Sequence, residues 1–123
     1  MKKWLLRQEP RHSDANHNLG LILTSNDKIE EALILFKLVT EINPNTEQYW
    51  ISYINALIKQ KKYDDAETIC KKALKFNANF TQVHLVLGLI LIGLGKLDEA
   101  ETIYRKIIEL NPDHSEAYNN LGT

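Results

Sequence analysis

Apolar residues recur every three or four positions over most of this chain, the spacing of amphipathic helices. After Thr81, one apolar stripe runs through Leu87, Leu91 and Leu94, and a second stripe begins at Leu97 after a short break. No proline interrupts a helical segment, and each pair of segments ends at Asn-Pro or Asn-Ala, where a helix stops or turns. The pattern predicts helices over residues 14–25, 28–41, 47–60, 63–76, 81–94 and 97–110, with a further helix beginning near Ser115.

Corresponding residues return every 34 positions along the chain. Alanine does so at Ala32, Ala66 and Ala100, and the hexapeptide that begins at Asp64 returns almost unchanged at Asp98. Periods of this length indicate stacked helix-turn-helix units, each of which needs a neighbour to bury its apolar face. The chain therefore divides into repeats at 13–46, 47–80 and 81–114, with the tail of an upstream repeat over 1–12 and the start of a truncated repeat over 115–123.

Small and flat side chains at fixed repeat positions predict how these helices pack. The recurring alanines, together with Gly20 and Gly88, allow the two helices of a repeat to approach closely. A flat side chain is expected to wedge between units near the start of each first helix, at Asn16, Trp50, His84 and Tyr118. Ser13, Thr81 and Ser115 are the expected N-caps of their helices.

These positions resemble the tetratricopeptide repeat family, whose pattern combines an early aromatic, Leu-Gly, a central Ala, a second aromatic and a late Pro. The clearest matches are Trp50, Leu87-Gly88, Ala100, Tyr104 and Pro112. The departures are Asn16 and His84 for the aromatic, Tyr53-Ile54 for Leu-Gly, and Ala78 for Pro. The resemblance covers residues 13–114 fully. It implies an all-α fold, a right-handed α-solenoid whose first helices line a concave groove.

The amino-acid composition excludes several classes of function for this chain. Lys and Arg number 15 against 16 Asp and Glu, so the near-neutral chain has no signature of nucleic-acid binding. Its apolar runs are too short to span a membrane, and the beginning of the chain does not read as a signal peptide. The single cysteine, Cys70, excludes an internal disulfide and fits a reducing compartment, so we expect a cytoplasmic protein.

Candidate catalytic and metal-binding residues favour structural roles. The acidic pairs Glu30-Glu31, Asp64-Asp65 and Asp98-Glu99 recur with the repeat, at the place where carboxylates favour a helix N-terminus. The four histidines do not supply a set of metal ligands, and Cys70 takes the inward position of Phe36 and Tyr104. Gly93 and Gly95 lack the residues of a phosphate-binding loop. We therefore expect no enzymatic activity, no cofactor and no metal.

The family resemblance places partner binding on the inner face of the first helices. The residues expected to contact a partner there are His17, Asn18, Leu21, Ile51, Asn55, Ile58, Leu85, Leu89, Ile92 and Asn120. Relatives that bind chaperone tails carry a carboxylate clamp of Lys, Asn, Asn, Lys and Arg. The corresponding residues here are His17, Leu21, Ser52, Gln82 and Val86, so the clamp is absent.

A second resemblance concerns bacterial arrays similar to those of the O-linked N-acetylglucosamine transferase type, which carry a ladder of inner asparagines. Asn18 and Asn120 match this ladder, whereas Ser52 and Val86 interrupt it. This resemblance leaves open an alternative function, in which the chain is the non-catalytic, acceptor-presenting module of a larger bacterial transferase.

The segment from Val83 to Leu94 departs most from an amphipathic pattern, because it is apolar on nearly every side. Either it forms a binding surface or a neighbouring unit or self-contact buries it. The leading hypothesis is a protein-interaction scaffold that binds a peptide or partner helix in its groove. Binding of single-stranded RNA is disfavoured by the neutral charge. Self-association through the repeat ends is a further expectation, because neither end reads as a polar cap.

Overall fold

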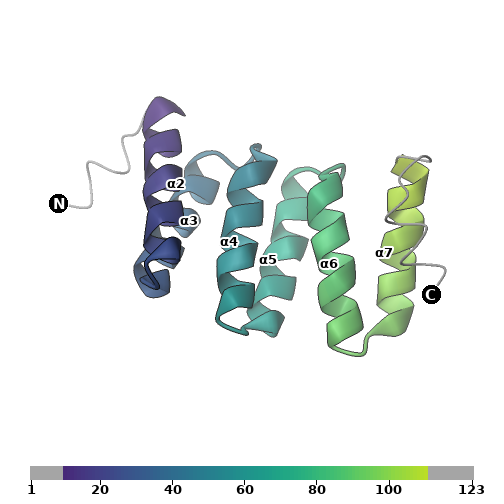
Figure 1. Ribbon diagram of the computed structural model, residues 1–123. Coiled ribbons are helices and arrows are strands. Elements are labelled where there is room, and N and C mark those ends of the chain that lie inside the picture. The colour runs from purple at the N-terminus through teal and green to yellow at the C-terminus, as the bar shows by residue number, and fades with distance from the viewer. Residues whose placement is uncertain (1–9, 111–123) are drawn as a thin grey trace. The chain divides into compact units, whose positions relative to one another are not determined.

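The computed structural model describes residues 10–110, and within that range the chain forms six α-helices and no strand (Figure 1). The helices are α2 (Pro10–Ser25), α3 (Ile29–Ile42), α4 (Glu47–Lys59), α5 (Tyr63–Phe76), α6 (Thr81–Gly93) and α7 (Leu97–Leu110). All six predicted helices are confirmed, and five of them begin within one residue of the predicted start. The further helix expected near Ser115 and the end segments 1–9 and 115–123 lie outside the described residues.

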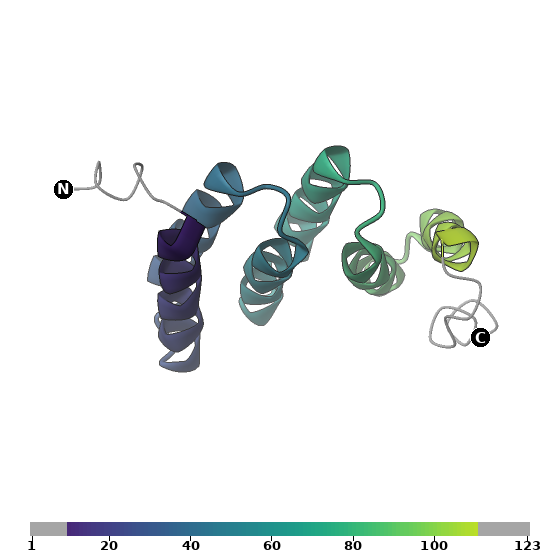
Figure 2. The same ribbon diagram turned by 90° about the horizontal axis from the view of Figure 1, so that it is seen from above.

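The helices fall into two compact units, Met1–Lys62 and Tyr63–Thr123. In the first unit α2 packs on α3 and α3 on α4, while in the second α5 packs on α6 and α6 on α7 (Figures 1 and 2). The division falls between α4 and α5, inside the segment 47–80 that the sequence assigns to one repeat.

The start of α2 differs from the prediction, because this helix begins at Pro10 rather than near residue 14. Proline is favoured in the first turn of a helix, where its missing N–H costs nothing. Ser13 is therefore not the N-cap. Its buried side chain lies inside the helix, and its Oγ accepts a 2.6 Å hydrogen bond from Nδ2 of Asn43. Thr81 is not an N-cap either, since it is the first residue of α6 and Phe80 precedes it without a side-chain cap.

The turn inside each repeat has the same backbone geometry in all three copies. Asp27, Lys61 and Gly95 lie 34 positions apart, and each has a positive φ, between 61° and 78°. The N–H of the residue after each bonds back to a carbonyl five positions earlier, from Lys28 to Leu23 at 2.8 Å in the first copy. This is the Schellman arrangement that ends a helix. The break in the apolar pattern is therefore a left-handed turn that occurs in all three repeats. Its left-handed residue is a glycine in one repeat only.

Close contact between paired helices rests on glycine, as the sequence predicted. A Cβ on Gly20 would lie 2.5 Å from Cε1 of Phe36, and one on Gly88 would lie 2.6 Å from Cζ of Tyr104. The recurring alanines Ala32, Ala66 and Ala100 are buried. Each aromatic ring thus packs directly against the backbone of the first helix, at a distance that a larger residue would prevent.

Near the start of the first helices, the side chains of Asn16, Trp50 and His84 are buried, while Tyr118 lies outside the described residues. Nε1 of Trp50 donates a 2.8 Å hydrogen bond to the carbonyl of Pro44, and Nε2 of His84 donates one of the same length to the carbonyl of Ala78. The two donors, like the two acceptors, lie 34 residues apart. A tryptophan and a histidine therefore each anchor the start of their helix to the preceding turn by an equivalent hydrogen bond.

Candidate functional site

The predicted partner-binding residues differ in how far their side chains are exposed to solvent. Five side chains are exposed to solvent, namely Asn18, Leu21, Asn55, Leu89 and Ile92. Ile51 and Ile58 are half-buried, His17 and Leu85 are buried, and Asn120 lies outside the described residues. Fewer of these residues are accessible than the sequence predicted. In each unit, taken by itself, the ninth repeat position is exposed, at Leu21 and Asn55 in the first unit and at Leu89 in the second.

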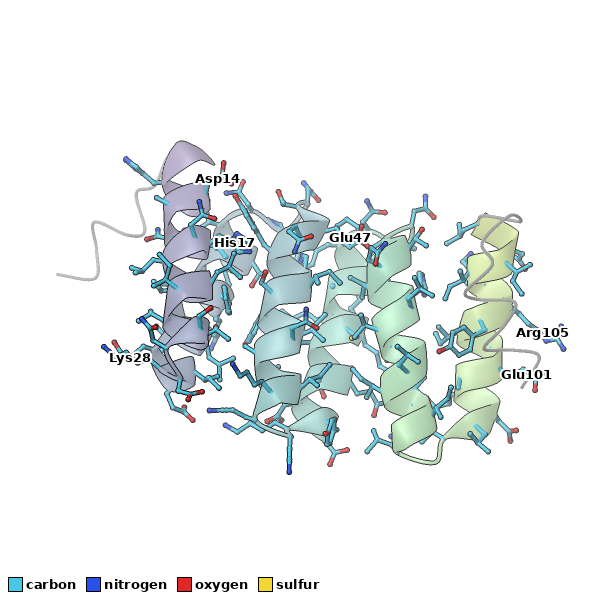
Figure 3. The ribbon with its side chains drawn as sticks, in the orientation of Figure 1. Asp14, His17, Lys28, Glu47, Glu101 and Arg105 are labelled. Atoms are coloured by element: carbon cyan, nitrogen blue, oxygen red, sulfur yellow. The ribbon has the colours of Figure 1, made fainter. Side chains whose placement is uncertain are left out.

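His17 faces the interior of the first unit instead of a partner. Its Nε2 lies 2.7 Å from Oγ of Ser52, and its ring packs against Phe36 and Tyr49 with centroids 5.8 and 4.9 Å away. Beside it, the hydroxyl of Tyr49 donates a hydrogen bond to Asp14. Asp14 and His17 both lie on α2 (Figure 3). Their partners Tyr49 and Ser52 lie on α4. This cluster joins two successive first helices.

The sequence pattern contained a signal for this cluster. Both side-chain hydrogen bonds in it join residues 35 positions apart, and so does the bond from Nζ of Lys59 to the carbonyl of Thr24. Adjacent first helices repeat every 34 residues, so side chains one position beyond the repeat face each other across the two helices. Tyr49 was the residue that the sequence reasoning missed, although it stands at that spacing from Asp14.

The cluster controls the protonation of its members. Burial lowers the pKa of His17, and the neighbouring Asp14 carboxylate acts against that change. Burial and the hydrogen bond to Asp14 raise the pKa of Tyr49 to about 12. The phenol therefore stays a donor at neutral pH, and the imidazole favours its neutral form inside the protein.

We expect the first unit to lose stability as the pH falls. The pKa of His17 lies below its unfolded value near 6.5, so the unfolded chain binds more protons and stability decreases below about pH 6.5, levelling off below the folded pKa. Urea unfolding of the wild type should show a lower midpoint at pH 5.5 than at pH 7.5, and His17→Asn should reduce this difference. His12→Asn, at an exposed position, serves as the control. An unchanged difference in His17→Asn would contradict this assignment.

The positions of the carboxylate clamp hold side chains with other roles. In the first unit, His17 and Ser52 are hydrogen-bonded to each other and Leu21 is an exposed hydrocarbon. In the second unit, the corresponding residues on α6 are Gln82 and the half-buried Val86. No cation stands at these positions, so the arrangement is unsuited to holding a C-terminal carboxylate.

Two apolar side chains of α6 are exposed to solvent in the second unit. Leu89 is 49% exposed and Ile92 41% exposed, and no charged residue occurs in the helix. Leu85, one turn before Leu89, is buried. The sequence left open whether the apolar pattern of α6 marks a surface or a buried helix. Within the described residues α6 combines the two alternatives, because most of its residues are buried whereas Leu89 and Ile92 are exposed.

Glu67 holds two lysines of the second unit in ion pairs. Glu67 is buried and bonds to Nζ of Lys71 at 2.8 Å and to Nζ of Lys96 at 2.9 Å, and these two hydrogen bonds lower its pKa. The recurring acidic pairs lie in the first turns of α3, α5 and α7, as predicted.

Cys70 is buried as expected, and desolvation raises its pKa to about 12, which suppresses the reactive thiolate.

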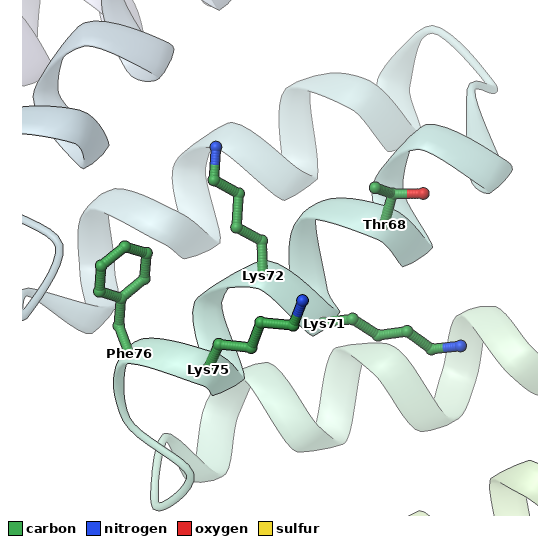
Figure 4. Close-up of a pocket in the computed structure, with 5 residues that line it drawn as sticks. All are labelled: Thr68, Lys71, Lys72, Lys75 and Phe76. Atoms are coloured by element: carbon green, nitrogen blue, oxygen red, sulfur yellow. The ribbon is translucent and has the colours of Figure 1, made fainter.

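A hollow runs along α5, lined by Thr68, Lys71, Lys72, Lys75 and Phe76 (Figure 4). Lys71 is already paired with Glu67 and Glu99. In residues 10–110 no three histidine, cysteine or acidic side chains gather where a metal ion could be held. Between residues 10 and 110, each helix is too short or too polar to span a lipid bilayer.

Comparison with protein families decides what the repeat is. A tetratricopeptide repeat profile matches residues 57–122, more than half of the chain, and a second profile of this repeat matches residues 13–46. The chain belongs to the tetratricopeptide repeat family. Tetratricopeptide repeat domains are typically non-catalytic interaction modules. A search of curated protein sequences gives no significant match.

Solved tetratricopeptide repeat structures are similar to this chain over nearly its whole length. The first such domain of Spaghetti (RPAP3), bound to the HSP90 peptide SRMEEVD, is 25% identical with a TM-score of 0.77, covering 92% of this chain and 90% of that one. The first domain of human RPAP3 is 26% identical with a TM-score of 0.77, covering 92% and 89%. MamA, 20% identical, has a TM-score of 0.76, covers 98% and 70%, and shows the fold alone. The chain is thus an all-α helical repeat array, whereas the bacterial, transferase-linked origin stays a prediction.

Proposed function

We propose that this tetratricopeptide repeat chain is a protein-interaction module that binds a peptide or partner helix through the exposed face of its first helices. The observation that carries the proposal is the exposure of Leu89 and Ile92, one turn apart on α6 of the second unit. Exposed leucine and isoleucine cost solubility and are typical of binding surfaces. The similar Spaghetti domain was solved with a bound peptide, which supports this class of partner.

The proposed partner is apolar where it contacts these side chains. The domain of Spaghetti is bound to a peptide that ends in Glu-Glu-Val-Asp, but the positions that would clamp a terminal carboxylate here hold His17, Leu21 and Ser52 in the first unit. Burial of Leu89 and Ile92 against aliphatic side chains would supply the affinity, at about 25 cal/mol per Å² of apolar surface. Asn18 and Asn55, both exposed, would hydrogen-bond the partner's backbone.

A peptide-display selection tests the proposal. The wild-type chain should enrich peptides that carry two or more aliphatic residues, and Leu89→Asp and Ile92→Asp should each weaken binding of a selected peptide by at least about tenfold, since each buries a charge in an apolar contact. Ile34→Asp is the matched control, because Ile34 on α3 is 56% exposed and lies outside the proposed face.

The outcome also separates this proposal from a chaperone-tail receptor. Titration with the peptide SRMEEVD, followed by calorimetry, should show no saturable binding. Tight binding of that peptide, or selected peptides that bind Leu89→Asp and Ile92→Asp as well as the wild type, would show that the assigned face is wrong. A cytoplasmic location remains an expectation drawn from the sequence.

A further inference from the structure

The hollow along α5 concentrates positive charge beside an aromatic ring. Its lining includes three exposed lysines, Lys71, Lys72 and Lys75. Phe76 lies at the end of the hollow with its side chain 51% exposed. Figure 4 shows Thr68, Lys72 and Phe76 projecting from the same side of α5, as residues four positions apart on a helix do. Ammonium groups and an accessible ring thus share one surface.

Two of these lysines lack a compensating charge in the part of the chain that the structure describes. Lys71 is held by Glu67 and Glu99, with distances from Nζ to carboxylate oxygen of 2.8 and 3.5 Å. Among residues 10–110, Lys72 and Lys75 take part in no ion pair. Like charges four residues apart, such as Lys71 and Lys75, repel each other across one turn of a helix. A bound anion would offset this repulsion.

The other repeats show that this charge is particular to α5. The residues 34 positions before and after Lys75 are Glu41 on α3 and Glu109 on α7. A lysine in the last turn favours the helix dipole, but α3 and α7 form with glutamate at that position, so helix stability does not require the lysine. On α7, Lys106 also has Glu109 three residues further on, at a spacing that suits opposite charges.

We propose that the hollow binds a short acidic segment of a partner protein that carries an aromatic residue. Its carboxylates would pair with Lys72 and Lys75, and its aromatic side chain would pack against Phe76. The peptide SRMEEVD has an arginine and no aromatic side chain, so it fits this surface poorly. The hollow is a second surface, separate from Leu89 and Ile92 of α6, and the inference therefore goes beyond the proposed function.

A short segment suits this surface better than a long polyanion. The exposed Asp64 and Asp65 lie at the start of the same helix, and Glu99 lies beside Lys71. A nucleic acid or an anionic membrane extends far beyond one helical turn and would meet these carboxylates. The hollow has a volume of about 530 Å³, which falls within the range of roughly 300–1,000 Å³ for ligand sites. Because the charges are exposed, we expect a dissociation constant on the order of 0.1–1 mM.

An NMR titration of the isotope-labelled full chain with the peptide SEEDWEES tests the proposal. The amide signals of residues 68–76 should shift saturably, and raising the salt from about 20 to about 300 mM should weaken binding at least about fivefold. Lys72→Glu and Lys75→Glu should each weaken binding at least about tenfold. Lys106→Glu is the matched control, because it makes the same charge change at the exposed counterpart of Lys72 on α7. The neutral peptide SQQNWQQS should leave the signals unchanged.

Four results would overturn the proposal. They are no saturable shift up to about 5 mM peptide, unchanged affinity in both α5 variants, an equal loss in Lys106→Glu, and tighter binding of a single-stranded oligonucleotide or phosphatidylserine vesicles than of SEEDWEES. Circular dichroism of each variant checks folding. Lys75→Glu should still bind a display-selected aliphatic peptide, and Leu89→Asp should keep the shifts caused by SEEDWEES. Failure at one surface is therefore distinguishable from failure at the other.

Discussion

Trp50→Ala is expected to lower the free energy of unfolding by about 3–5 kcal/mol, the largest single effect that we predict. The indole is 1% exposed, so its removal leaves a cavity that the surrounding helices fill only in part. The carbonyl of Pro44 also loses the 2.8 Å hydrogen bond from Nε1. Urea unfolding followed by circular dichroism measures the change, since helix content reports on the whole chain without relying on tryptophan emission.

The chain offers a matched control for this substitution. His84 holds the same repeat position on α6 and makes the equivalent hydrogen bond to Ala78. Trp50→His should therefore cost less than Trp50→Ala, because the imidazole keeps a ring and a donor where the alanine keeps neither. If both variants lost the same stability, the bond to the preceding turn would have no role. A loss below about 1 kcal/mol in Trp50→Ala would show that the cavity closes.

Gly88→Ala is expected to lower the free energy of unfolding by about 2 kcal/mol. The added Cβ would lie 2.6 Å from Cζ of Tyr104 and 2.9 Å from its hydroxyl oxygen. The ring is 1% exposed, so it has no free space to move into, and overpacking of this kind costs about 1–3 kcal/mol. Alanine regains up to about 1 kcal/mol through its higher helix propensity, which limits the net loss. Thermal unfolding of both proteins measures the difference.

Gly93→Ala is the internal control for Gly88→Ala. Gly93 is the last residue of α6, and a Cβ there would meet no other atom within 4 Å. The same exchange should therefore be neutral or slightly stabilising at Gly93. Combining Gly88→Ala with Tyr104→Leu should cost less than the sum of the two single changes, because the smaller side chain relieves the clash. Full additivity would show that the ring and the new methyl group do not meet.

The repeat pattern predicted the helices well because each is specified by local features. Apolar spacing and proline placement locate a helix to within a few residues. The N-caps were wrong at Ser13 and Thr81, since hydroxyl residues near a helix start are suited to capping but also to other bonds. Ser13 instead accepts a bond from Asn43, which is 30 positions away. A distant partner of that kind leaves no trace in local sequence.

The candidate binding face was predicted less completely than the fold. Leu21, Asn55 and Leu89 are exposed where the resemblance placed them, but His17 and Leu85 are buried. His17 differs because Ser52, Phe36 and Tyr49 surround it from two other helices. From the sequence, a polar residue in the middle of a first helix is predicted to be exposed. Only the structure reveals the hydrogen-bond partner that allows such a residue to be buried.

The sequence alone determined the 34-residue period, the helices and the close approach of paired helices at Gly20 and Gly88, because each depends on residue types at fixed separations. That Phe36 and Tyr104 are the rings packed against these glycines came from the structure. Only the tertiary structure decided that His17 belongs to the interior and that Leu19 and Ile22 remain open. Helical periodicity states which residues share a face of a helix. Which neighbour covers that face is a property of the packed chain, and here the same repeat position is buried at Leu87 and exposed at Leu19.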